Sequence, residues 1–418
     1  MTIRNLDRLF EPSSVALIGA SDRDGSVGKV VLRNLRAGAF KGDIALVNPK
    51  HQVVAGLPCH ADVGQLPVAP DLAIIATPAA TVPDLVERLA RRGTKAVVIL
   101  SAGFGGIAGR DLKDRVLAAA RPHLVRLVGP NCVGMLAPAI GLNASFAHLM
   151  PAKGSLAFLS QSGAIITSVI DWAAARNIGF SYLVSMGEMA DVDFGDMLDY
   201  LAADAGTSAI LLYMEAVTHA RKFMSAARRA ARLKPVIVIK AGRHHEAARA
   251  VASHTGALAG SDAVYDAAFE RAGLLRVLDL DALFEATETL ALARKPAGDR
   301  LAILTDGGGI GILATDALLD FGGRLAELSP ETIARLDAVL PRGWSRGNPI
   351  DIIGDAPAQR YADALAILLE DNGADAILVL NCPTAVTSGV EAARAVVDTV
   401  KAHACDAIHR NGIVALRV

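Results

Sequence analysis

The feature that most constrains the fold is a repeating pattern in which short apolar runs alternate with longer helical patterns. In the first part of the chain the predicted strands are residues 14–18, 43–47, 72–76, 96–100 and 126–128. A helical pattern at residues 28–37 follows the first of them. Strands that alternate with helices form parallel sheets covered on both faces. This part is therefore predicted to be a doubly wound domain that binds ligands at the carboxyl ends of its strands.

The same pattern continues to the end of the chain. Further strands are predicted at residues 156–159, 182–185, 209–214, 235–240, 301–304, 376–380 and 413–416, with helices at 165–176, at 261–272 and from about 312. The polar stretch at 294–299 is typical of a linker. The expected domains are residues 1–150, 151–296 and 297–418, all of them α/β, and the last is short enough to be incomplete.

Composition excludes several classes of partner. The formal net charge of the 418 residues is -1, so no strong field favours nucleic acid or an anionic membrane. No apolar run has the length of a membrane span, and the N-terminal residues lack a signal core. The four cysteines show no paired spacing, so neither a disulfide framework nor a metal site is expected. These features predict a cytoplasmic protein.

A glycine-rich loop, residues 19–28, joins the first predicted strand to the first predicted helix. Such a junction binds phosphate groups through backbone N–H groups, and this role is favoured over a purely structural loop. The spacing is not that of a dinucleotide fingerprint, and Asn48 ends the second strand where a nicotinamide cofactor would require an acidic residue. Lys50 instead supplies a cation that suits an additional ribose phosphate, such as that of coenzyme A.

A second strand-to-helix junction carries Ser160, Gln161, Ser162 and Gly163. Two hydroxyl groups and a small residue at a helix N-terminus can hold an anion, although an ordinary helix cap would use the same residues.

His254 lies in a loop of small residues, 252–262, between a predicted strand and a predicted helix. Neutral imidazole can accept and pass on a phosphoryl group, and small neighbours such as Gly256 let backbone N–H groups approach phosphate oxygens. Glu215 ends the predicted strand at residues 209–214, and its carboxylate could orient the His254 ring by accepting a hydrogen bond from the Nδ1–H group. A lone loop histidine is usually without function, and the surrounding motifs make the catalytic interpretation the stronger one.

With these residues assembled, the chain resembles the NDP-forming acyl-CoA synthetases, relatives of the α subunit of succinyl-CoA synthetase. The matching segments, in chain order, are EPSSVALIGAS, NPK, GPNCVG, SQSGA, DVDFGDMLDYLAAD, YMEA, KAGR and SHTGALAGSDAVYDAAFERAG. A further match runs from Leu301 to about Thr384. One departure is Gly187-Glu188, where relatives usually carry a Gly-Asn pair.

The resemblance implies a CoA-binding Rossmann-like domain followed by two flavodoxin-like domains, and it implies roles for single residues. The residues expected to face CoA are Gly19, Ser21, Gly25, Val27, Lys50, Thr77, Pro78 and Asn131, with Cys132 near the thiol end. Those expected to hold the phosphoryl group are Ser160, Gln161, Ser162, Gly163 and Gly256. His254 would be the phosphorylated residue and Glu215 its orienting partner.

The implied reaction joins a small carboxylic acid to CoA at the expense of ATP, through a phosphohistidine and an acyl phosphate, and releases ADP and phosphate. Most relatives use an ATP-grasp domain or β subunit that binds ATP, ADP and Mg²⁺, and no segment here matches one. The chain is expected to be either an α-type subunit of an oligomer or the N-terminal portion of a longer synthetase. The acid pocket is expected in irregular loops such as residues 143–153, or on a partner surface.

Two rival functions remain open from the sequence. The first is a CoA-binding regulatory part of a fused protein acetyltransferase, against which the presence of both His254 and Glu215 argues. The second is an NAD(P)-dependent oxidoreductase that would use residues 305–311 as a dinucleotide loop. Asn48 and the spacing of the first loop count against it.

Overall fold

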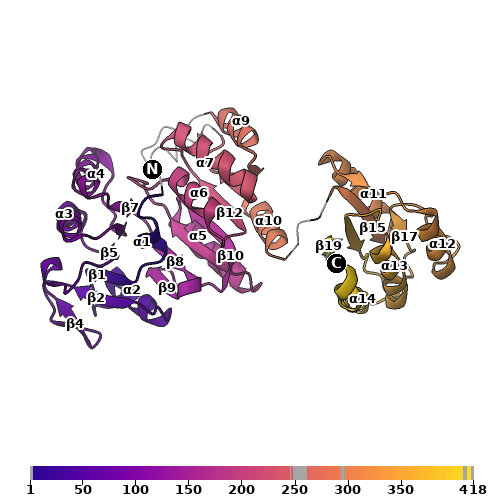
Figure 1. Ribbon diagram of the computed structural model, residues 1–418, viewed down its shortest axis with the longest axis horizontal. Coiled ribbons are helices and arrows are strands. Elements are labelled where there is room, and N and C mark those ends of the chain that lie inside the picture. Colours follow the sequence, from indigo (N-terminus) through magenta and orange to yellow (C-terminus); the bar gives the residue numbers. More distant parts are fainter. Residues whose placement is uncertain are drawn as a thin grey trace. The chain divides into compact units, whose positions relative to one another are not determined.

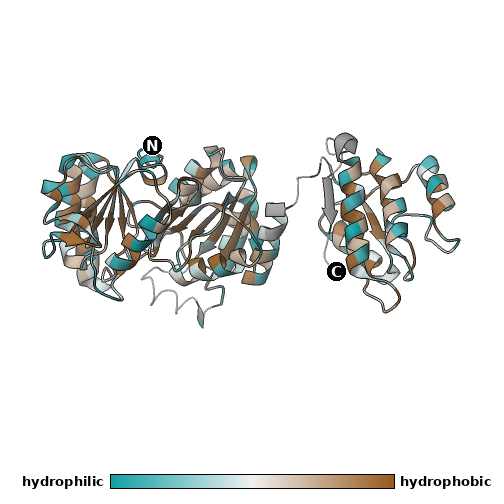
Figure 2. Cartoon of the chain, turned by 90° about the horizontal axis from the view of Figure 1, so that it is seen from below, coloured by the Kyte–Doolittle hydropathy of each residue, from teal (hydrophilic) through white to brown (hydrophobic). Residues whose placement is uncertain are grey.

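The computed structural model describes residues 3–244, 246–247, 261–292, 296, 298–407 and 412–415. The chain divides into two compact units, Met1–Ala291 and Leu292–Val418 (Figure 1). Unit 1 contains two seven-stranded sheets, and unit 2 contains one five-stranded sheet. In both units the strands are mainly hydrophobic and the outer faces of the helices mainly hydrophilic (Figure 2). The predicted α/β fold class is confirmed.

The first sheet of unit 1 has the strand order β3-β4-β2-β1-β5-β6-β7. Its elements are α1 (Asp7–Phe10), β1 (Ser14–Ile18), α2 (Val27–Ala37), β2 (Asp43–Val47), β3 (Val53–Val54), β4 (Leu57–His60), β5 (Leu72–Ile75), α3 (Val82–Arg92), β6 (Ala96–Ile99), α4 (Gly106–Ala120) and β7 (Arg126–Val128). All pairs are parallel except β3 with β4. The five predicted strands are confirmed to within one residue at each end.

Alternate residues of this sheet pack on opposite faces, as expected of pleated strands covered on both sides. Ala16 and Ile18 of β1 share a core with α3 and α4, whereas Val15 and Leu17 share another with α2. This doubly wound arrangement brings the carboxyl ends of β1, β2 and β5 to one edge, beside the start of α2.

The second sheet of unit 1 has the order β14-β13-β12-β10-β11-β8-β9. Its elements are β8 (Gly134–Ala137), β9 (Leu142–Ser145), β10 (Lys153–Ser160), α5 (Gly163–Ala174), β11 (Phe180–Ser185), α6 (Phe194–Ala203), β12 (Ala209–Met214), α7 (Ala220–Leu233), β13 (Val236–Lys240), α9 (Asp262–Ala272), β14 (Leu275–Val277) and α10 (Leu280–Leu292).

Strands β8 and β9 form an antiparallel pair that the sequence analysis did not predict. Residues 143–145 belong to β9, so the expectation of an irregular loop over 143–153 is wrong at its beginning and at Lys153, which starts β10. The pair extends the sheet that starts in the expected second domain. The domain boundaries proposed from the sequence remain a prediction.

The two sheets of unit 1 share one hydrophobic core. Leu17 of β1, Met135 of β8 and Leu212 of β12 belong to the same cluster of buried side chains. Phe10 lies between the two sheets, with its ring 4.6 Å from the ring of Tyr182 and 4.5 Å from that of Tyr200. The carboxyl edges of both sheets are therefore held in a fixed relation within this unit.

Unit 2 is a smaller doubly wound domain with the strand order β16-β15-β18-β19 and with β17 also paired to β15. Its elements are β15 (Arg300–Thr305), α11 (Gly308–Asp320), β16 (Arg324–Leu325), α12 (Pro330–Val339), β17 (Ile350–Asp351), α13 (Ala358–Glu370), β18 (Ala376–Leu380), α14 (Gly389–Ala407) and β19 (Gly412–Ala415). Helix α11 begins four residues before the expected position, because Gly308 and Gly309 already belong to its first turn. Among the described helices, none combines the length and the apolar composition needed to cross a bilayer.

Candidate active site

A cavity of about 990 Å³ lies at the carboxyl ends of β1, β2 and β5, beside the start of α2. Glycine is required at two positions in the loop between β1 and α2. Gly19 has φ +96°, and a Cβ atom there would lie 2.7 Å from the carbonyl oxygen of Ala76. A Cβ atom at Gly28 would lie 2.0 Å from the carbonyl oxygen of Gly19. The loop thus packs directly against its own helix, with Ser26 as the N-cap that accepts the Lys29 N–H.

Six of the residues expected to face CoA line this first cavity: Gly19, Ser21, Val27, Lys50, Thr77 and Pro78. Gly25 lies in the same loop with φ +72° but does not line it. Two further residues that carry or can carry positive charge, Arg23 and His51, also line the cavity and were missed. Their side-chain types could have suggested phosphate contacts, but no pattern in the sequence placed them at this edge.

Asn48 has a structural role at this edge. Its side-chain amide donates a hydrogen bond to the carbonyl oxygen of Ala20 at 2.7 Å, and its amide oxygen accepts one from the Lys50 N–H at 2.9 Å. The Asn48 side chain therefore ties the ends of β1 and β2 together and fixes the backbone at Lys50. Asn48 therefore holds the backbone at the position where a nicotinamide cofactor would require an acidic residue for its ribose.

A second cavity, of about 480 Å³, adjoins the first. Val27, Ala76 and Thr77 line both cavities, so the two are adjacent. Asn131 and Cys132 line the second cavity from the first sheet, and Gln161, Ser162 and Gly163 line it from the second. The structure thus brings four of the expected CoA residues and three of the expected phosphate residues to the wall of one cavity: Val27, Thr77, Asn131, Cys132, Gln161, Ser162 and Gly163.

The junction between β10 and α5 is organised by side-chain hydrogen bonds. Ser160 does not line the cavity: its hydroxyl accepts from the Ser162 N–H at 3.1 Å and donates to the Ser162 carbonyl at 2.7 Å. The Gln161 side-chain oxygen accepts from the backbone N–H groups of Glu215 (2.6 Å) and Ala216 (2.9 Å). Ser162 and Gly163 remain at the cavity, where helix α5 begins. The first N–H groups of a helix lack intrahelical partners and favour an anion.

Glu215 follows β12 and is 6% exposed, at the same edge as this junction. His254 and Gly256, the expected phosphohistidine and one of the expected phosphate-binding residues, lie outside the described residues. The proposed pairing of His254 with Glu215 therefore remains a prediction.

Lys240 is a buried charged residue at this edge that the sequence analysis did not single out as a site residue. It is 2% exposed and pairs in register with Met214, the residue before Glu215. Burial lowers the pKa of its ammonium group. The Nζ atom lies 4.5 Å from the ring centroid of Tyr265 in α9, a cation–π contact that joins the end of β13 to the first turn of α9.

Cys132 is buried, and its thiol donates to the carbonyl oxygen of Ile99 at 3.3 Å. Burial raises the pKa of this thiol to about 12. The side chain is thus a protonated thiol near neutral pH, which packs against the cavity and does not act as a nucleophile.

Glu188 belongs to the Gly187-Glu188 pair, at the position where relatives usually carry a Gly-Asn pair, and it lines the second cavity. Its carboxylate forms an ion pair with the Lys113 ammonium of α4 at 2.7 Å, and the two side chains are 13% and 24% exposed. This partner compensates the negative charge that Glu188 introduces beside the expected phosphate residues.

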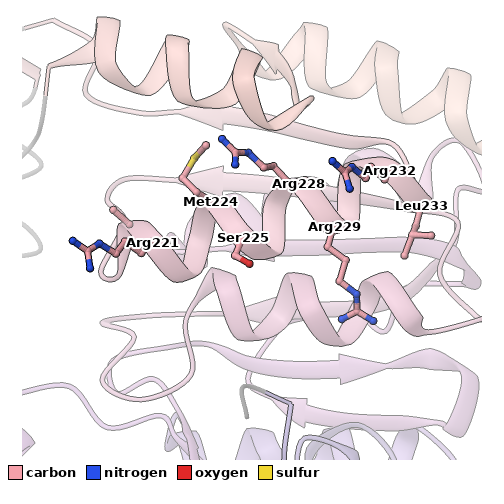
Figure 3. Close-up of a pocket in the computed structure, with 8 residues that line it drawn as sticks. Arg221, Met224, Ser225, Arg228, Arg229, Arg232 and Leu233 are labelled. Atoms are coloured by element: carbon pink, nitrogen blue, oxygen red, sulfur yellow. The ribbon is translucent and has the colours of Figure 1, made fainter.

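A hollow of about 770 Å³ lies on the outer face of α7, where Arg221, Arg228 and Arg232 project from the helix (Figure 3). All of its lining residues belong to this one helix, so it is a helix surface. Arg229 reaches α6 and donates to the carbonyl oxygen of Asp199 at 3.3 Å. Lys234 donates to the carbonyl oxygens of Leu201 and Asp204. The contacts of Arg229 and Lys234 hold the C-terminal part of α7 against the end of α6.

Unit 2 contains a junction built like that of Ser160 and Ser162. The Thr305 hydroxyl accepts from the Gly307 N–H at 3.0 Å and donates to the Gly307 carbonyl at 3.2 Å, and α11 begins at the next residue. Residues 305–311 therefore contain a strand-to-helix turn of the same type. In the part of the chain that the structure describes, no group of three or more His, Cys, Asp or Glu side chains is placed to hold a metal ion.

Family models match successive parts of the chain. A CoA binding domain matches residues 13–138, a succinyl-CoA ligase like flavodoxin domain matches 153–290, and a ligase-CoA domain matches 301–417. These three α/β domains in this order place the chain in the CoA-ligase class of proteins. The chain belongs to the NDP-forming acyl-CoA synthetase family.

Three relatives illustrate the match. The chain is 45% identical over 394 residues to acetate–CoA ligase [ADP-forming] I of Archaeoglobus fulgidus, covering 94% of this chain and 57% of that protein. It is 38% identical over 399 residues to the α subunit of acetate–CoA ligase [ADP-forming] I of Pyrococcus furiosus, covering 94% and 86%. It is 36% identical to the solved structure of Ca. Korarchaeum cryptofilum dinucleotide forming acetyl-coenzyme A synthetase 1 in complex with phosphate and ADP. That alignment has a TM-score of 0.92 and covers 98% of this chain and 88% of the other.

Proposed function

We propose that this chain is the CoA-binding and phosphoryl-carrying portion of an ADP-forming acid–thiol ligase. The observation that carries the proposal is the pair of adjoining cavities in unit 1, which share Val27, Ala76 and Thr77 as walls. A molecule that extends from the first cavity into the second passes from the glycine-rich loop to the start of α5. CoA has this layout, with phosphates at one end and a thiol at the other.

The residues of the first cavity hold the phosphate groups of CoA. Backbone N–H groups of the loop at Gly19 and Ser21 meet the diphosphate at the start of α2. Lys50 and Arg23 bring positive charge to the same cavity, where the additional ribose phosphate would bind, and the His51 side chain also lines it. The pantetheine arm then runs past Thr77 and Asn131 and ends near Cys132.

The chemistry takes place in the second cavity and at the loop of His254. The His254 imidazole accepts a phosphoryl group, and Glu215 holds the ring so that Nε2 is the nucleophile. The carboxylate of the acid then attacks the phosphorus atom, the bond from Nε2 to phosphorus breaks, and an acyl phosphate forms. The CoA thiolate attacks the acyl carbon, and phosphate leaves. The first N–H groups of α5 stabilise the charge on the phosphoryl oxygens during both steps.

The donor of the phosphoryl group in this proposal is ATP, bound with Mg²⁺ on an ATP-grasp domain or β subunit. The related P. furiosus protein is named as an α subunit, and the chain spans just over half of the related A. fulgidus protein. Both facts are consistent with a further part that binds the nucleotide. We place this assembly in the cytoplasm, in line with the cysteine usage and charge of the chain.

The proposal is tested with the chain combined with an ATP-grasp partner. His254→Ala is expected to abolish labelling of the chain by radiolabelled ATP and also ligation, while CoA binding stays within twofold of wild type. Full activity in this variant would remove the mechanism. A titration of the chain with CoA and with NAD distinguishes this proposal from the oxidoreductase alternative, since only CoA should bind.

A further inference from the structure

The second cavity has one apolar wall whose aromatic residue is exposed. Phe146 is 36% exposed and lines this cavity together with Val133, which is 8% exposed. A large apolar side chain at the wall of a cavity, open to solvent, is the kind of surface that binds an apolar group.

The position of this wall is fixed by the second sheet. Strands β8 and β9 pair Gly134 with Ser145, and the next backbone hydrogen bond joins the Phe146 N–H to the Val133 carbonyl at 3.1 Å. The Val133 N–H in turn donates to the Ser185 hydroxyl at 3.0 Å. Both residues therefore stand on paired backbone, and the wall is preformed.

The same wall adjoins the start of α5. A Cβ atom at Gly163 would lie 2.3 Å from Cγ2 of Val133, so Val133 packs directly against the first turn of this helix. An acid whose carboxyl group lies at the helix start would place its substituent next to Val133 and Phe146.

The charges around the cavity favour an uncharged substituent. The described residues that line it include no lysine, arginine or histidine, and the one charged residue among them, Glu188, is an acid already paired with Lys113. A second carboxylate on the acid would meet no cation on these walls and would face the carboxylate of Glu188.

We propose that Phe146, supported by Val133, is a specificity-determining residue that binds the acyl substituent of a monocarboxylic acid with an apolar chain longer than that of acetate. This inference rests on the proposed function of the same cavity. It assigns the acid pocket to a residue at the end of β9 and excludes dicarboxylic acids.

The test measures the dissociation constants of CoA, acetyl-CoA, butyryl-CoA and succinyl-CoA with the 418-residue chain by isothermal titration calorimetry. These thioesters carry the acyl group into the second cavity without the need for an ATP-grasp partner. Butyryl-CoA has two more methylene groups than acetyl-CoA and should bind about tenfold more tightly. Succinyl-CoA should bind no more tightly than acetyl-CoA.

Phe146→Ala is expected to reduce the preference for butyryl-CoA to less than about threefold and to leave the affinity for free CoA unchanged. Phe146→Leu keeps an apolar side chain and should retain an intermediate preference for butyryl-CoA over acetyl-CoA. The melting temperature of each variant shows whether it is folded. Leu149→Ala is the matched control, because Leu149 is 42% exposed on the same loop but does not line the cavity.

Three results would overturn the inference. One is the absence of any wild-type preference for butyryl-CoA, and another is tighter binding of succinyl-CoA than of butyryl-CoA. The third is an equal loss of affinity for CoA and butyryl-CoA in Phe146→Ala, which would make Phe146 a contact of pantetheine. A wild-type chain that binds no CoA at all would remove the proposed function itself, and this result is distinct from the other three.

Discussion

Single residues at the two cavities differ in whether their side chains are used to hold the backbone. Lys50 is exposed and lines the first cavity, while Asn48 beside it is used to join the ends of two strands. Ser160 and Gln161 likewise hold the turn at α5 through their side chains, and Gln161 also lines the second cavity together with Ser162 and Gly163. The residue type alone, which the sequence analysis used, does not separate these two roles.

Lys50→Ala should weaken CoA binding about fivefold, because the variant loses one partly screened contact with a phosphate, worth about 1 kcal/mol. Dephospho-CoA lacks the ribose phosphate, and its affinity should stay unchanged in the variant. Calorimetric titrations with both ligands check this result. Lys41→Ala is the control, since Lys41 is exposed and does not line the cavity. An equal loss for both ligands would show that Lys50 does not meet the ribose phosphate.

Cys132 should resist alkylation in the folded chain. Burial raises the pKa of this thiol to about 12, so the reactive thiolate form is scarce at pH 8. Iodoacetamide at pH 8 followed by peptide mass spectrometry should find Cys132 unmodified in the native chain and modified in urea. Rapid modification of the native chain would contradict both the burial and the raised pKa.

At the scale of elements, helix α6 depends on an ionic network around its N-cap. Asp193 accepts the N–H groups of the first turn and pairs with the Lys222 ammonium of α7 at 2.9 Å. Burial alone would raise the pKa of the Asp193 carboxyl, but Lys222 and hydrogen bonds from Thr218 and His219 bring it below its usual range. A lowered pKa in the folded state stabilises the fold above the pKa of the unfolded chain, about 3.9, and this contribution is lost as the pH falls through the folded value.

Asp193→Asn should therefore lower the free energy of unfolding by about 2 kcal/mol at pH 7, and the difference from wild type should shrink as the pH falls below about 4. Urea unfolding at several pH values measures this difference. The comparison variant is Asp24→Asn, whose carboxylate is 97% exposed in a surface pair with Lys29 and should change little. If the difference in the free energy of unfolding between wild type and Asp193→Asn grew on acidification, the pKa of Asp193 would not be lowered in the folded state.

The longer strands of the parallel sheets, such as β1 and β12, were predictable because each is a buried apolar run closed by turn residues. The short parallel strands β4, β14, β16 and β17, of two to four residues, were not predicted. Strands β8 and β9 were not predictable in this way. They are four-residue antiparallel strands, and their pairing depends on contact with β11. The wall formed by Phe146 follows from that pairing. The segment 143–153 was expected to contribute to the acid pocket, but no sequence pattern singled out Phe146 within it. The Lys113–Glu188 ion pair was hidden for the same reason, since its partners come from elements far apart in the chain.

For the whole molecule, the division into two units has a consequence for binding. All the lining residues of both cavities belong to unit 1, whose two sheets share one core. A fragment of residues 1–292 should therefore fold and bind CoA within about twofold of the 418-residue chain. Circular dichroism and calorimetric titration of the fragment check both points. A loss of more than tenfold in a folded fragment would mean that unit 2 contributes to the CoA site.

The central claim, that His254 carries a phosphoryl group in a CoA-dependent reaction, is tested most directly in the reverse direction. Phosphate attacks the thioester of an acyl-CoA to release CoA and form an acyl phosphate. The His254 imidazole then attacks its phosphorus atom, and the carboxylate of the acid leaves. The chain incubated with radiolabelled phosphate and a panel of acyl-CoA thioesters should gain an acid-labile, base-stable label. His244→Ala should keep the label, and His254→Ala should lose it while still binding CoA. Labelling of His254→Ala at the wild-type level would contradict the account.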